Sequence, residues 1–540
     1  MAEMNPSNPL VQALLTDFYQ ITMAYAYWKC NKHNDDACFD LFFRKNPFRG
    51  EFTIFCGLEE CIRHILNVGF SQSDIDYLRQ VLPDDVHEGF LEYLLNLDGS
   101  DITLHAIPEG SIVFPREPLI TVEGPLAKLQ IIETTLLNLV NFASLVATNA
   151  ARFRLVAGED VRLLEFGLRR AQGPDGAVSA SRYCYIGGFD ATSNILAGKM
   201  YGIPCKGTNA HSFITSFNKL TDLDHIEKTI NGCPCTMKDF IQICLSYKEA
   251  VCNLLKVNSS ETIEGELTSF ISYAFTFPKS YLVLVDSYDV FNSGVPNFLI
   301  VALALQSLNF KAIGVRIDSG DLAYQSIEIR KAFNLAAEHF GFDYFSGLSI
   351  IGSNDICEET IASLNQQGHS LNAFGVGTHL VTCKSQPALG CVYKLVKVNG
   401  LNRIKLSEDP IKTTMPGKKV VYRLFGKEGH PLADIIQEDG EPAPEGRVLC
   451  RHPNVELKRV YINPTSFKCL QKTWVKNGKV SEQLPSIHEI KKLCENEIKM
   501  MRKDHVRLLN PTPYKVSVSE AMYQMMHRMI LEHTPIREME

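Results

Sequence analysis

Polar residues follow directly after four short apolar runs in the middle of the chain, and together they indicate phosphate and sugar chemistry. The segments that end these runs are Asp286-Ser287-Tyr288-Asp289, Arg316-Ile317-Asp318-Ser319-Gly320-Asp321, Ser353-Asn354-Asp355 and Gly375-Val376-Gly377-Thr378. If the runs are parallel strands, their carboxyl ends meet at one edge of a sheet or barrel, where ligands bind in such folds. The sequence therefore predicts that several carboxylates, one arginine and a glycine-rich turn share one rim.

Each of these segments also has an ordinary structural explanation when it is taken singly. An Asp-Ser pair can cap a helix, and Gly375–Thr378 can be a simple turn. Arg316 is more specific, because a guanidinium between Val315 and Ile317 in a barrel strand is costly unless it meets an anion. Backbone amides in the glycine turn suit a phosphate group, and carboxylates can hold the water shell of Mg²⁺. Together the segments indicate an enzyme that acts on a phosphorylated, Mg²⁺-bound sugar.

Two further segments would fit the same rim. Glu165–Arg170 places Phe166 and two arginines at the end of an earlier strand-like run, and Gly207–Ser212 places His211 in a small polar loop. A single histidine is more often structural. Beside the hydroxyl of Thr208, however, it could be a nucleophile or a proton carrier.

The elements that must hold these residues alternate regularly between about residues 149 and 383. The strand-like runs are Val161–Phe166, Tyr281–Val285, Ala312–Ile317, Leu348–Gly352 and Asn372–Gly375. Helix-like runs between them include Asn297–Leu308, Leu322–His339 and Glu358–Gln367. Strands in alternation with helices indicate parallel βαβ units, and hence a barrel or a doubly wound sheet.

The flanking regions have a different order of helical and strand-like runs, so the sequence predicts three domains. The predicted domains are residues 1–148, 149–383 and 384–540. The first mixes helical runs with short strand-like runs, which suggests an α+β domain. In the last, Val392–Val398 and Arg403–Leu406 flank Asn399-Gly400 as a β-hairpin. The sequence from Pro410 to Pro453 is then rich in loops, and two helices, Ile487–His505 and Val518–His533, form the tail.

Length and charge are those of a large globular protein whose partner is a small molecule. The 540 residues carry a net charge of −7, which argues against nucleic acid or an anionic membrane as partner. The apolar stretches Val295–Phe310 and Ile131–Thr148 are interrupted by polar residues and shorter than a membrane-spanning helix requires. We therefore expect both to be buried helices, and the amino terminus lacks the pattern of a secretion signal.

The cysteines indicate a reducing compartment. The sixteen cysteines are spread along the chain, which is typical of a cytosolic protein without disulfides. Cys233 and Cys235 lie close together around Pro234, but they lack the two-residue spacer of zinc and redox motifs. We expect a turn with two structural thiols there rather than a metal or redox site.

The sequence resembles the animal type of the nicotinate phosphoribosyltransferase family, and the matching stretches run through nearly the whole chain. They are Leu14–Gln20, Phe42–Arg44, Ser144–Ala151, Phe166–Gly176, Ala210–Phe213, Gly314–Asp321, Gly375–Thr378 and Tyr393–Val396, and Asn510-Pro511 with Tyr514 is similar to the family's terminal pattern.

This resemblance implies a reaction, a fold and partners. The family joins nicotinate to 5-phosphoribosyl 1-diphosphate, giving nicotinate mononucleotide and diphosphate, the first step of NAD synthesis from nicotinate. ATP hydrolysis to ADP and phosphate is coupled to this step, and Mg²⁺ (or Mn²⁺) is required. The implied fold is an irregular, TIM-like α/β barrel beside an N-terminal open-faced α/β sandwich, to which the chain returns after the barrel, with a C-terminal extension. The implied assembly is a cytosolic homodimer with shared active sites.

The same resemblance assigns roles to individual residues. Tyr19, Thr208 and Arg316 would bind nicotinate, and His211 would be phosphorylated by ATP. Thr378, with Gly375 and Gly377, would lie in the phosphate-holding loop. Phe166 and Arg169 are similar to residues of the base pocket in related nicotinamide enzymes. Asp286, Asp318 and Ser319 would lie near the ribose and diphosphate, the two aspartates as catalytic residues. No side chain is assigned as a direct metal ligand.

Two other functions stay open on the residues alone. An enzyme that prefers nicotinamide would need similar parts, but a neutral amide would not repay the desolvation of Arg316 as a carboxylate does. A catalytically silent binding protein could use the same fold, although His211, Arg316 and the Gly375–Thr378 segment are all present.

Overall fold

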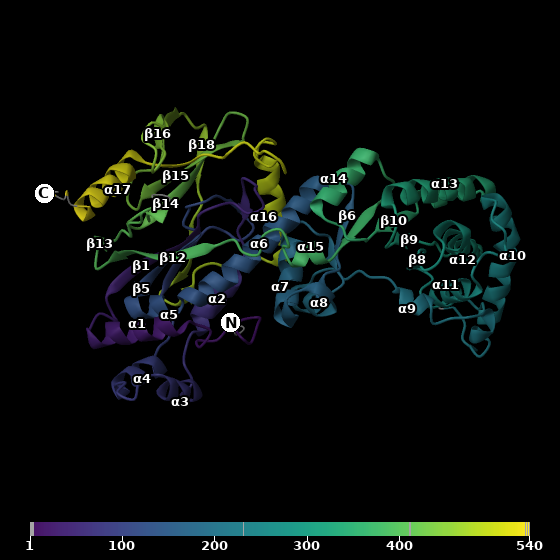
Figure 1. Ribbon diagram of the computed structural model, residues 1–540, viewed down its shortest axis with the longest axis horizontal. Coiled ribbons are helices and arrows are strands. Elements are labelled where there is room, and N and C mark those ends of the chain that lie inside the picture. The colour runs from purple at the N-terminus through teal and green to yellow at the C-terminus, as the bar shows by residue number, and fades with distance from the viewer. Residues whose placement is uncertain (1–4, 231, 410–411, 535, 537, 539–540) are drawn as a thin grey trace. The chain divides into compact units, whose positions relative to one another are not determined.

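The chain forms two compact units (Figure 1). The structure is a computed structural model that describes residues 5–230, 232–409, 412–534, 536 and 538. Unit 1 contains residues 1–151, 182–188 and 383–540, and unit 2 contains residues 152–181 and 189–382. The C-terminal region therefore belongs to the same unit as the N-terminal region, and the short segment 182–188 inside the predicted barrel domain also belongs to unit 1.

Unit 2 is built on a six-stranded sheet in the order β7-β6-β11-β10-β9-β8, in which every neighbouring pair is parallel. The strands are β6 (Arg162–Glu165), β7 (Ala191–Thr192), β8 (Leu282–Leu284), β9 (Gly314–Ile317), β10 (Ser349–Gly352) and β11 (Ala373–Val376). The sheet curls into half of a barrel, which confirms the predicted α/β class. Parallel strands bring their carboxyl ends to one edge, as the site requires.

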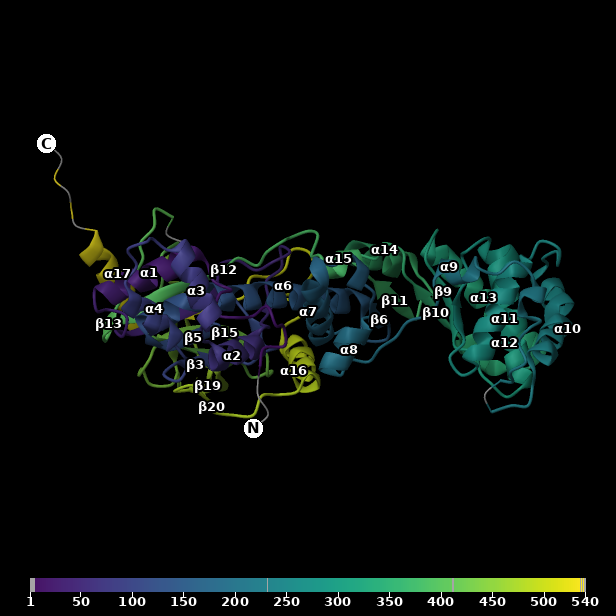
Figure 2. The same cartoon turned by 90° about the horizontal axis from the view of Figure 1, so that it is seen from below.

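Helices connect the strands of unit 2. They are α8 (Ile195–Tyr201), α9 (His211–Ile214), α10 (Met237–Leu255), α11 (Glu264–Thr276), α12 (Val295–Ser307), α13 (Leu322–Phe340), α14 (Glu358–Gln367) and α15 (Thr378–Val381), with helical turns η1 (Leu168–Arg170), η2 (Leu220–Leu223), η3 (Val290–Gly294) and η4 (Asp343–Gly347). Helices α6 (Glu133–Ala157) and α7 (Gly173–Ile186) continue across the unit boundaries in sequence. Helices α10 to α13 gather beside β8 and β9, whereas α14 lies beside β11 (Figure 2).

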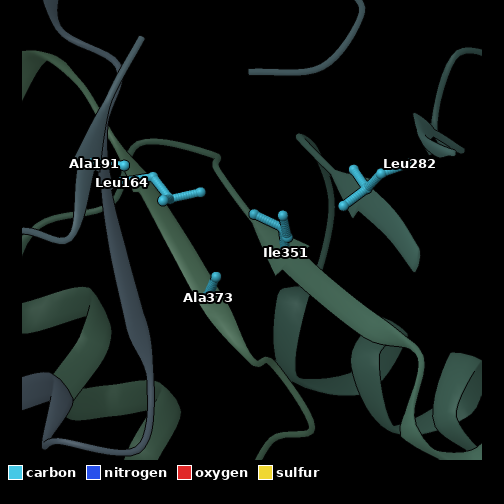
Figure 3. Packing of buried hydrophobic residues seen from close by; sticks show 5 residues of the cluster. All are labelled: Leu164, Ala191, Leu282, Ile351 and Ala373. Carbon is cyan, nitrogen blue, oxygen red and sulfur yellow. The ribbon is translucent and has the colours of Figure 1, made fainter. Parts of the chain in front are cut away.

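One face of the sheet carries a small apolar cluster that lies under the site. Its members are Leu164, Ala191, Leu282, Ile351 and Ala373, from five different strands (Figure 3). Because side chains alternate along a strand, Phe166, two residues after Leu164, returns to this face and packs against the cluster. Arg316 pairs with Ile351 across the β9–β10 ladder, so it shares the same face.

Unit 1 contains two larger sheets and one pair of short strands. The seven-stranded sheet is antiparallel in the order β13 (Leu401–Asn402), β12 (Cys391–Val398), β1 (Asp36–Phe43), β5 (Ile120–Pro125), β3 (Thr103–Ala106), β19 (Lys472–Lys476) and β20 (Lys479–Val480). The six-stranded sheet has the order β17 (Arg459–Ile462), β16 (Val448–Arg451), β21 (Val516–Val518), β15 (Pro431–Glu438), β14 (Lys419–Phe425) and β18 (Ser466–Cys469), and β2 (Thr53–Ile54) pairs with β4 (Ile112–Val113). The other helices are α1 (Phe18–Lys29), α2 (Leu58–Asn67), α3 (Gln72–Val81), α4 (Glu88–Leu95), α5 (Leu126–Ile131), α16 (Ile487–Met500) and α17 (Glu520–His533).

The predicted buried helix at 295–310 is α12. Within the described residues, Val290–Ser307 is the stretch long and apolar enough to cross a membrane, but 78% of it is buried inside the structure. Every residue from Val295 to Leu305 is buried, and the helix packs against α10 and α11. It is therefore a core helix, and the second apolar stretch, 131–148, lies mainly in α6.

Two sequence predictions in the C-terminal region are wrong. The segment 410–453, predicted to be rich in loops, contains the whole of β14, β15 and β16; residues 410 and 411 lie outside the described part. The prolines of the segment suggested loops, but β14 is a strand whose two charged residues, Lys419 and Arg423, are buried in ion pairs, with Asp40 at 2.7 Å and with Asp434 at 2.7 Å. In the hairpin, Asn399 and Gly400 have the predicted positive φ, yet the second strand is Leu401–Asn402 rather than Arg403–Leu406.

Candidate active site

The rim residues of unit 2 are joined by hydrogen bonds at the carboxyl ends of β8, β9 and β10. The Asp318 backbone N–H donates to Asp286 Oδ2 at 3.0 Å, and the Ser319 hydroxyl donates to the same oxygen at 2.6 Å. The Ser353 hydroxyl donates to Asp318 Oδ1 at 2.5 Å. The ends of three neighbouring strands are thus joined through side chains that follow them in sequence.

Asp286 is the centre of this network. Its carboxylate is only 2% exposed, and its Oδ1 lies 3.2 Å from Nε2 of His211. His211 begins α9 and its side chain is 43% exposed. The histidine is therefore held at one ring nitrogen by a buried carboxylate while the rest of the ring stays accessible, an arrangement that orients an imidazole for chemistry.

The Arg316 guanidinium is fixed on three sides. Its Nε donates to the Ser353 hydroxyl at 2.8 Å, its Nη1 donates to the Thr208 hydroxyl at 3.3 Å, and its Nη2 lies 3.4 Å from Asp318 Oδ1. The guanidinium carbon also lies 5.4 Å from the centre of the Phe166 ring, within range of a cation–π contact. The side chain is 13% exposed, so a planar cation is held in one orientation beside an aromatic face.

The loop that carries Thr208 is attached to the edge of the sheet. The side-chain oxygen of Asn209 accepts a hydrogen bond from the Leu284 backbone N–H at 3.3 Å. Because β8 is an edge strand, this N–H would otherwise lack a strand partner on that side. This contact positions Thr208 toward Arg316 and His211 toward Asp286.

The Phe166 ring depends on a glycine. A Cβ atom on Gly375 would lie 2.5 Å from Cε2 and 2.6 Å from Cδ2 of that ring, closer than real Cβ contacts. The backbone of Gly377 also passes close to the Phe166 carbonyl, with 3.3 Å from its ideal Cβ to the oxygen. The glycine-rich segment is therefore required for the ring to lie over β11, in addition to any role in holding phosphate.

Glu165, just before Phe166, was not singled out from the sequence as a site residue. Its carboxylate is fully buried and accepts hydrogen bonds from the Gly167 backbone N–H, from Ser181 Oγ at 2.8 Å and from Thr192 Oγ1 at 2.5 Å. A carboxylate directly after Leu163-Leu164 in a buried strand was the signal that could have shown this role. Glu165 fixes the turn on which Phe166 sits.

The structure brings together most, but not all, of the predicted site residues. Phe166, Thr208, His211, Asp286, Arg316, Asp318 and Ser319 form one connected network in unit 2, and Gly375 and Gly377 adjoin Phe166. Thr378 follows at the start of α15 and is exposed. Arg169 is exposed on η1, and Tyr19 lies in unit 1 on α1 with 47% of its surface exposed.

The carboxylates of the network are largely occupied by protein partners. In the part of the chain that the structure describes, no group of three or more His, Cys, Asp or Glu side chains could hold a metal ion. Both oxygens of Asp286 and one oxygen of Asp318 already have protein partners. Hydrogen bonds within the protein therefore already use most of the oxygens that a directly bound ion would need.

Comparisons of sequence and of structure with known proteins point to the same family along nearly the whole chain. The profile of the Nicotinate phosphoribosyltransferase (NAPRTase) family matches residues 161–465, and those of its N-terminal and C-terminal domains match residues 14–141 and 418–526. Nicotinate phosphoribosyltransferases of Caenorhabditis elegans and Homo sapiens are 53% and 43% identical to this chain, each over 99% of it, and the alignments cover 96% and 100% of those proteins. The crystal structure of human Nicotinic Acid Phosphoribosyltransferase is similar with a TM-score of 0.86 and 42% identity, covering 95% of this chain and 99% of that one.

The fold and the rim are those of a phosphoribosyltransferase built on a parallel α/β half-barrel. The chain belongs to the nicotinate phosphoribosyltransferase family, as its sequence motifs predicted.

Substituting Gly375 with alanine tests whether the position of the Phe166 ring matters for activity. We expect kcat/KM for nicotinate to fall by about 1–3 kcal/mol, or roughly 5- to 150-fold, because the added methyl group must displace the ring. Steady-state kinetics with nicotinate as the varied substrate measures this loss. Gly347→Ala is the matched control, because its Cβ would meet nothing within 4 Å. Equal activity of the two variants would contradict a role for the ring.

Proposed function

We propose that the chain joins nicotinate to 5-phosphoribosyl 1-diphosphate, releasing diphosphate and nicotinate mononucleotide, and that ATP hydrolysis through His211 drives the step. The observation that carries the proposal is the Arg316 guanidinium, held by Ser353, Thr208 and Asp318 beside the Phe166 ring. Such a pairing of planar cation and aromatic face suits a planar aromatic carboxylate.

Recognition of the carboxylate separates nicotinate from nicotinamide. The Nη atoms of Arg316 could pair with the carboxylate, and the Thr208 hydroxyl could donate to it, while the pyridine ring stacks on Phe166. The neutral amide of nicotinamide would offer the guanidinium one acceptor and no charge. It would therefore compensate less of the free energy that is needed to desolvate Arg316. The geometry therefore favours nicotinate over nicotinamide.

The diphosphate and the ribose would lie along the remaining rim. Backbone amides of Gly375, Gly377 and Thr378 would bind phosphate oxygens, and Ser319 could donate a further hydrogen bond. Asp286 and Asp318 would hold the water shell of the Mg²⁺ that accompanies the sugar diphosphate. That ion would neutralise the leaving diphosphate.

The reaction itself needs little proton transfer. The C1–O bond to diphosphate breaks and a C1–N bond to the pyridine nitrogen forms through an oxocarbenium-like transition state. The nitrogen is already unprotonated at neutral pH, so the task of the site is to align the two substrates and to stabilise the leaving group.

ATP would act through His211. The ring is anchored at Nε2 by Asp286 and is 43% exposed, which leaves Nδ1 free to attack the γ-phosphorus of ATP and release ADP. Water then hydrolyses the phosphohistidine to histidine and phosphate. While it lasts, the phosphoryl group adds roughly −1.5 to −2 charges next to the rim, and this charge could change the affinity for substrate and product.

Tyr19 would complete the pocket from a second subunit in a homodimer. It lies at the start of α1 in unit 1, next to Phe18, and these two aromatic side chains are 47% and 55% exposed. Exposed neighbouring rings suit a contact with another chain. A cytosolic location would fit the sixteen cysteines, all of which are free thiols.

Arg316→Lys tests the proposed function. The lysine keeps the charge but loses the planar fork, so we expect kcat/KM for nicotinate to fall by about 1.5–3 kcal/mol, or roughly 10- to 150-fold. The KM for 5-phosphoribosyl 1-diphosphate should change less, and preference for nicotinate over nicotinamide should shrink. Arg330→Lys is the control, because that guanidinium donates to Asn372 away from the rim. Equal losses for both substrates would indicate a phosphate or structural role, and absence of product from the wild type would indicate a silent binding protein.

His211→Ala tests the coupling to ATP. The variant should lose ATP hydrolysis and its stimulation of synthesis, because no phosphohistidine can form, while slow ATP-independent synthesis stays measurable. Product and ADP are quantified together by chromatography, with the exposed His339→Ala as control. ATP hydrolysis in step with product in His211→Ala would show that the histidine is only structural.

Mixed dimers test whether Tyr19 acts across subunits. Tyr19→Ala is expected to be a weak enzyme because it loses stacking, which contributes ~0.5–1.5 kcal/mol beyond area burial. Arg316→Ala is expected to be weak because it loses the cation that pairs with the nicotinate carboxylate. When the two variants are co-expressed, a shared pocket leaves one site per mixed dimer with both residues intact, so up to half of the normal activity should return. No recovery in purified mixed dimers would contradict the shared site.

A further inference from the structure

Unit 1 contains a cavity of about 570 Å³ whose walls are strongly basic. It lies between the segment after β1, the turn after β4 and the neighbouring strands β16, β17 and β21. The basic lining residues are Arg44, Arg116, His452, Lys458, Arg459 and Lys515. Glu51 is the acidic residue among those that line it. The walls therefore carry a clear excess of positive charge.

Several of these cations lack a counter-ion. Among the described residues, the side chains of Arg116, Lys458 and Lys515 have no ion pair and no hydrogen bond. Burial lowers the pKa of Arg116. Burial, followed by the charges of Arg116 and Lys458, lowers the pKa of His452. Cations that repel one another at the wall of a cavity leave a positive potential that an anion would relieve.

The wall that carries Arg116 has a strained backbone that is held by hydrogen bonds and ring stacking. Arg116 has φ +76°, a left-handed conformation that few non-glycine residues adopt. Its backbone N–H donates to the Phe43 carbonyl at 2.8 Å, and the fully buried Glu117 accepts from the Phe114 N–H at 2.8 Å. The Phe114 and Tyr514 rings stack with centres 3.9 Å apart. Strain of this kind is concentrated at binding sites, where the fold imposes it on a functional residue.

We propose that this pocket binds a small anion with two or more linked phosphate groups. The volume lies in the usual range of small-molecule sites, and guanidinium groups pair with phosphate oxygens through two parallel hydrogen bonds. A single phosphate would leave several of the basic side chains unneutralised. A nucleoside diphosphate and an inorganic polyphosphate share this chemistry. All lining residues belong to unit 1, and the inference does not rest on the proposed function of unit 2.

Lysine labelling on the full wild-type chain tests the proposal. Pyridoxal 5′-phosphate is the probe, because its phosphate binds at anion sites and its aldehyde condenses with a nearby lysine, releasing water. Borohydride then reduces the imine to a stable secondary amine that peptide mass spectrometry locates. Lys476 and Lys479, exposed on β19 and β20 of the same unit, are the reference lysines. Protection is measured with inorganic pyrophosphate and, separately, with ADP.

We expect Lys458 and Lys515 to be labelled at least ~10-fold faster than the reference lysines, as charge-assisted hydrogen bonds to phosphate predict. Equal protection by pyrophosphate and ADP would identify the phosphate chain as the recognised group, and stronger protection by ADP would identify a nucleotide. Arg116→Ala should lower the labelling preference by about tenfold, whereas Arg79→Ala on α3 should leave it unchanged. Uniform labelling, labelling that neither anion protects, or an unchanged pattern in Arg116→Ala would each overturn the proposal.

Discussion

The buried Asp286 carboxylate is the constraint on which the site of unit 2 depends. A carboxylate that is 2% exposed is costly unless its oxygens have partners. Here the partners are the Asp318 N–H and the Ser319 hydroxyl after β9, together with His211 at the start of α9. Satisfying one buried charge therefore fixes the relative positions of two strand ends and of the loop that carries the histidine. Arg316 joins this network through Asp318 and Ser353.

The face of the sheet below the network provides its support. Leu164 and Ile351 belong to the apolar cluster. Phe166 lies on the same face because it follows Leu164 by two residues, and Arg316 lies there because it pairs with Ile351 across the β9–β10 ladder. Gly375 leaves the space that the Phe166 ring occupies, and the buried Glu165 fixes the turn that follows its strand. The Arg316 guanidinium and the Phe166 ring keep their relative positions because apolar packing holds the ring and hydrogen bonds hold the guanidinium.

The sequence allowed the parallel sheet and most of the rim to be predicted, because both depend on local patterns. Short apolar runs that end in polar residues mark β8 to β11 within one or two residues, and α14 has the predicted bounds. Long-range pairing was not predictable in the same way. The prolines of 410–453 suggested loops, and the burial of Lys419 and Arg423 in β14 depends on Asp40 and Glu497, which lie far from them in the sequence. For the same reason Glu165 gave no sign of its partners Ser181 and Thr192.

The role of Asp286 in holding His211 is tested most directly by histidine phosphorylation in an Asp286→Asn variant. Each protein is incubated with ATP labelled on the γ-phosphate, and base-stable, acid-labile label is located by peptide mapping. Asp321→Asn is the control, since that side chain caps α13 by accepting from the Tyr324 N–H. We expect label on His211 in the wild type and the control, and roughly 10- to 100-fold less in a folded Asp286→Asn protein. Equal labelling of His211 in Asp286→Asn, or label on another residue in the wild type, would contradict this role.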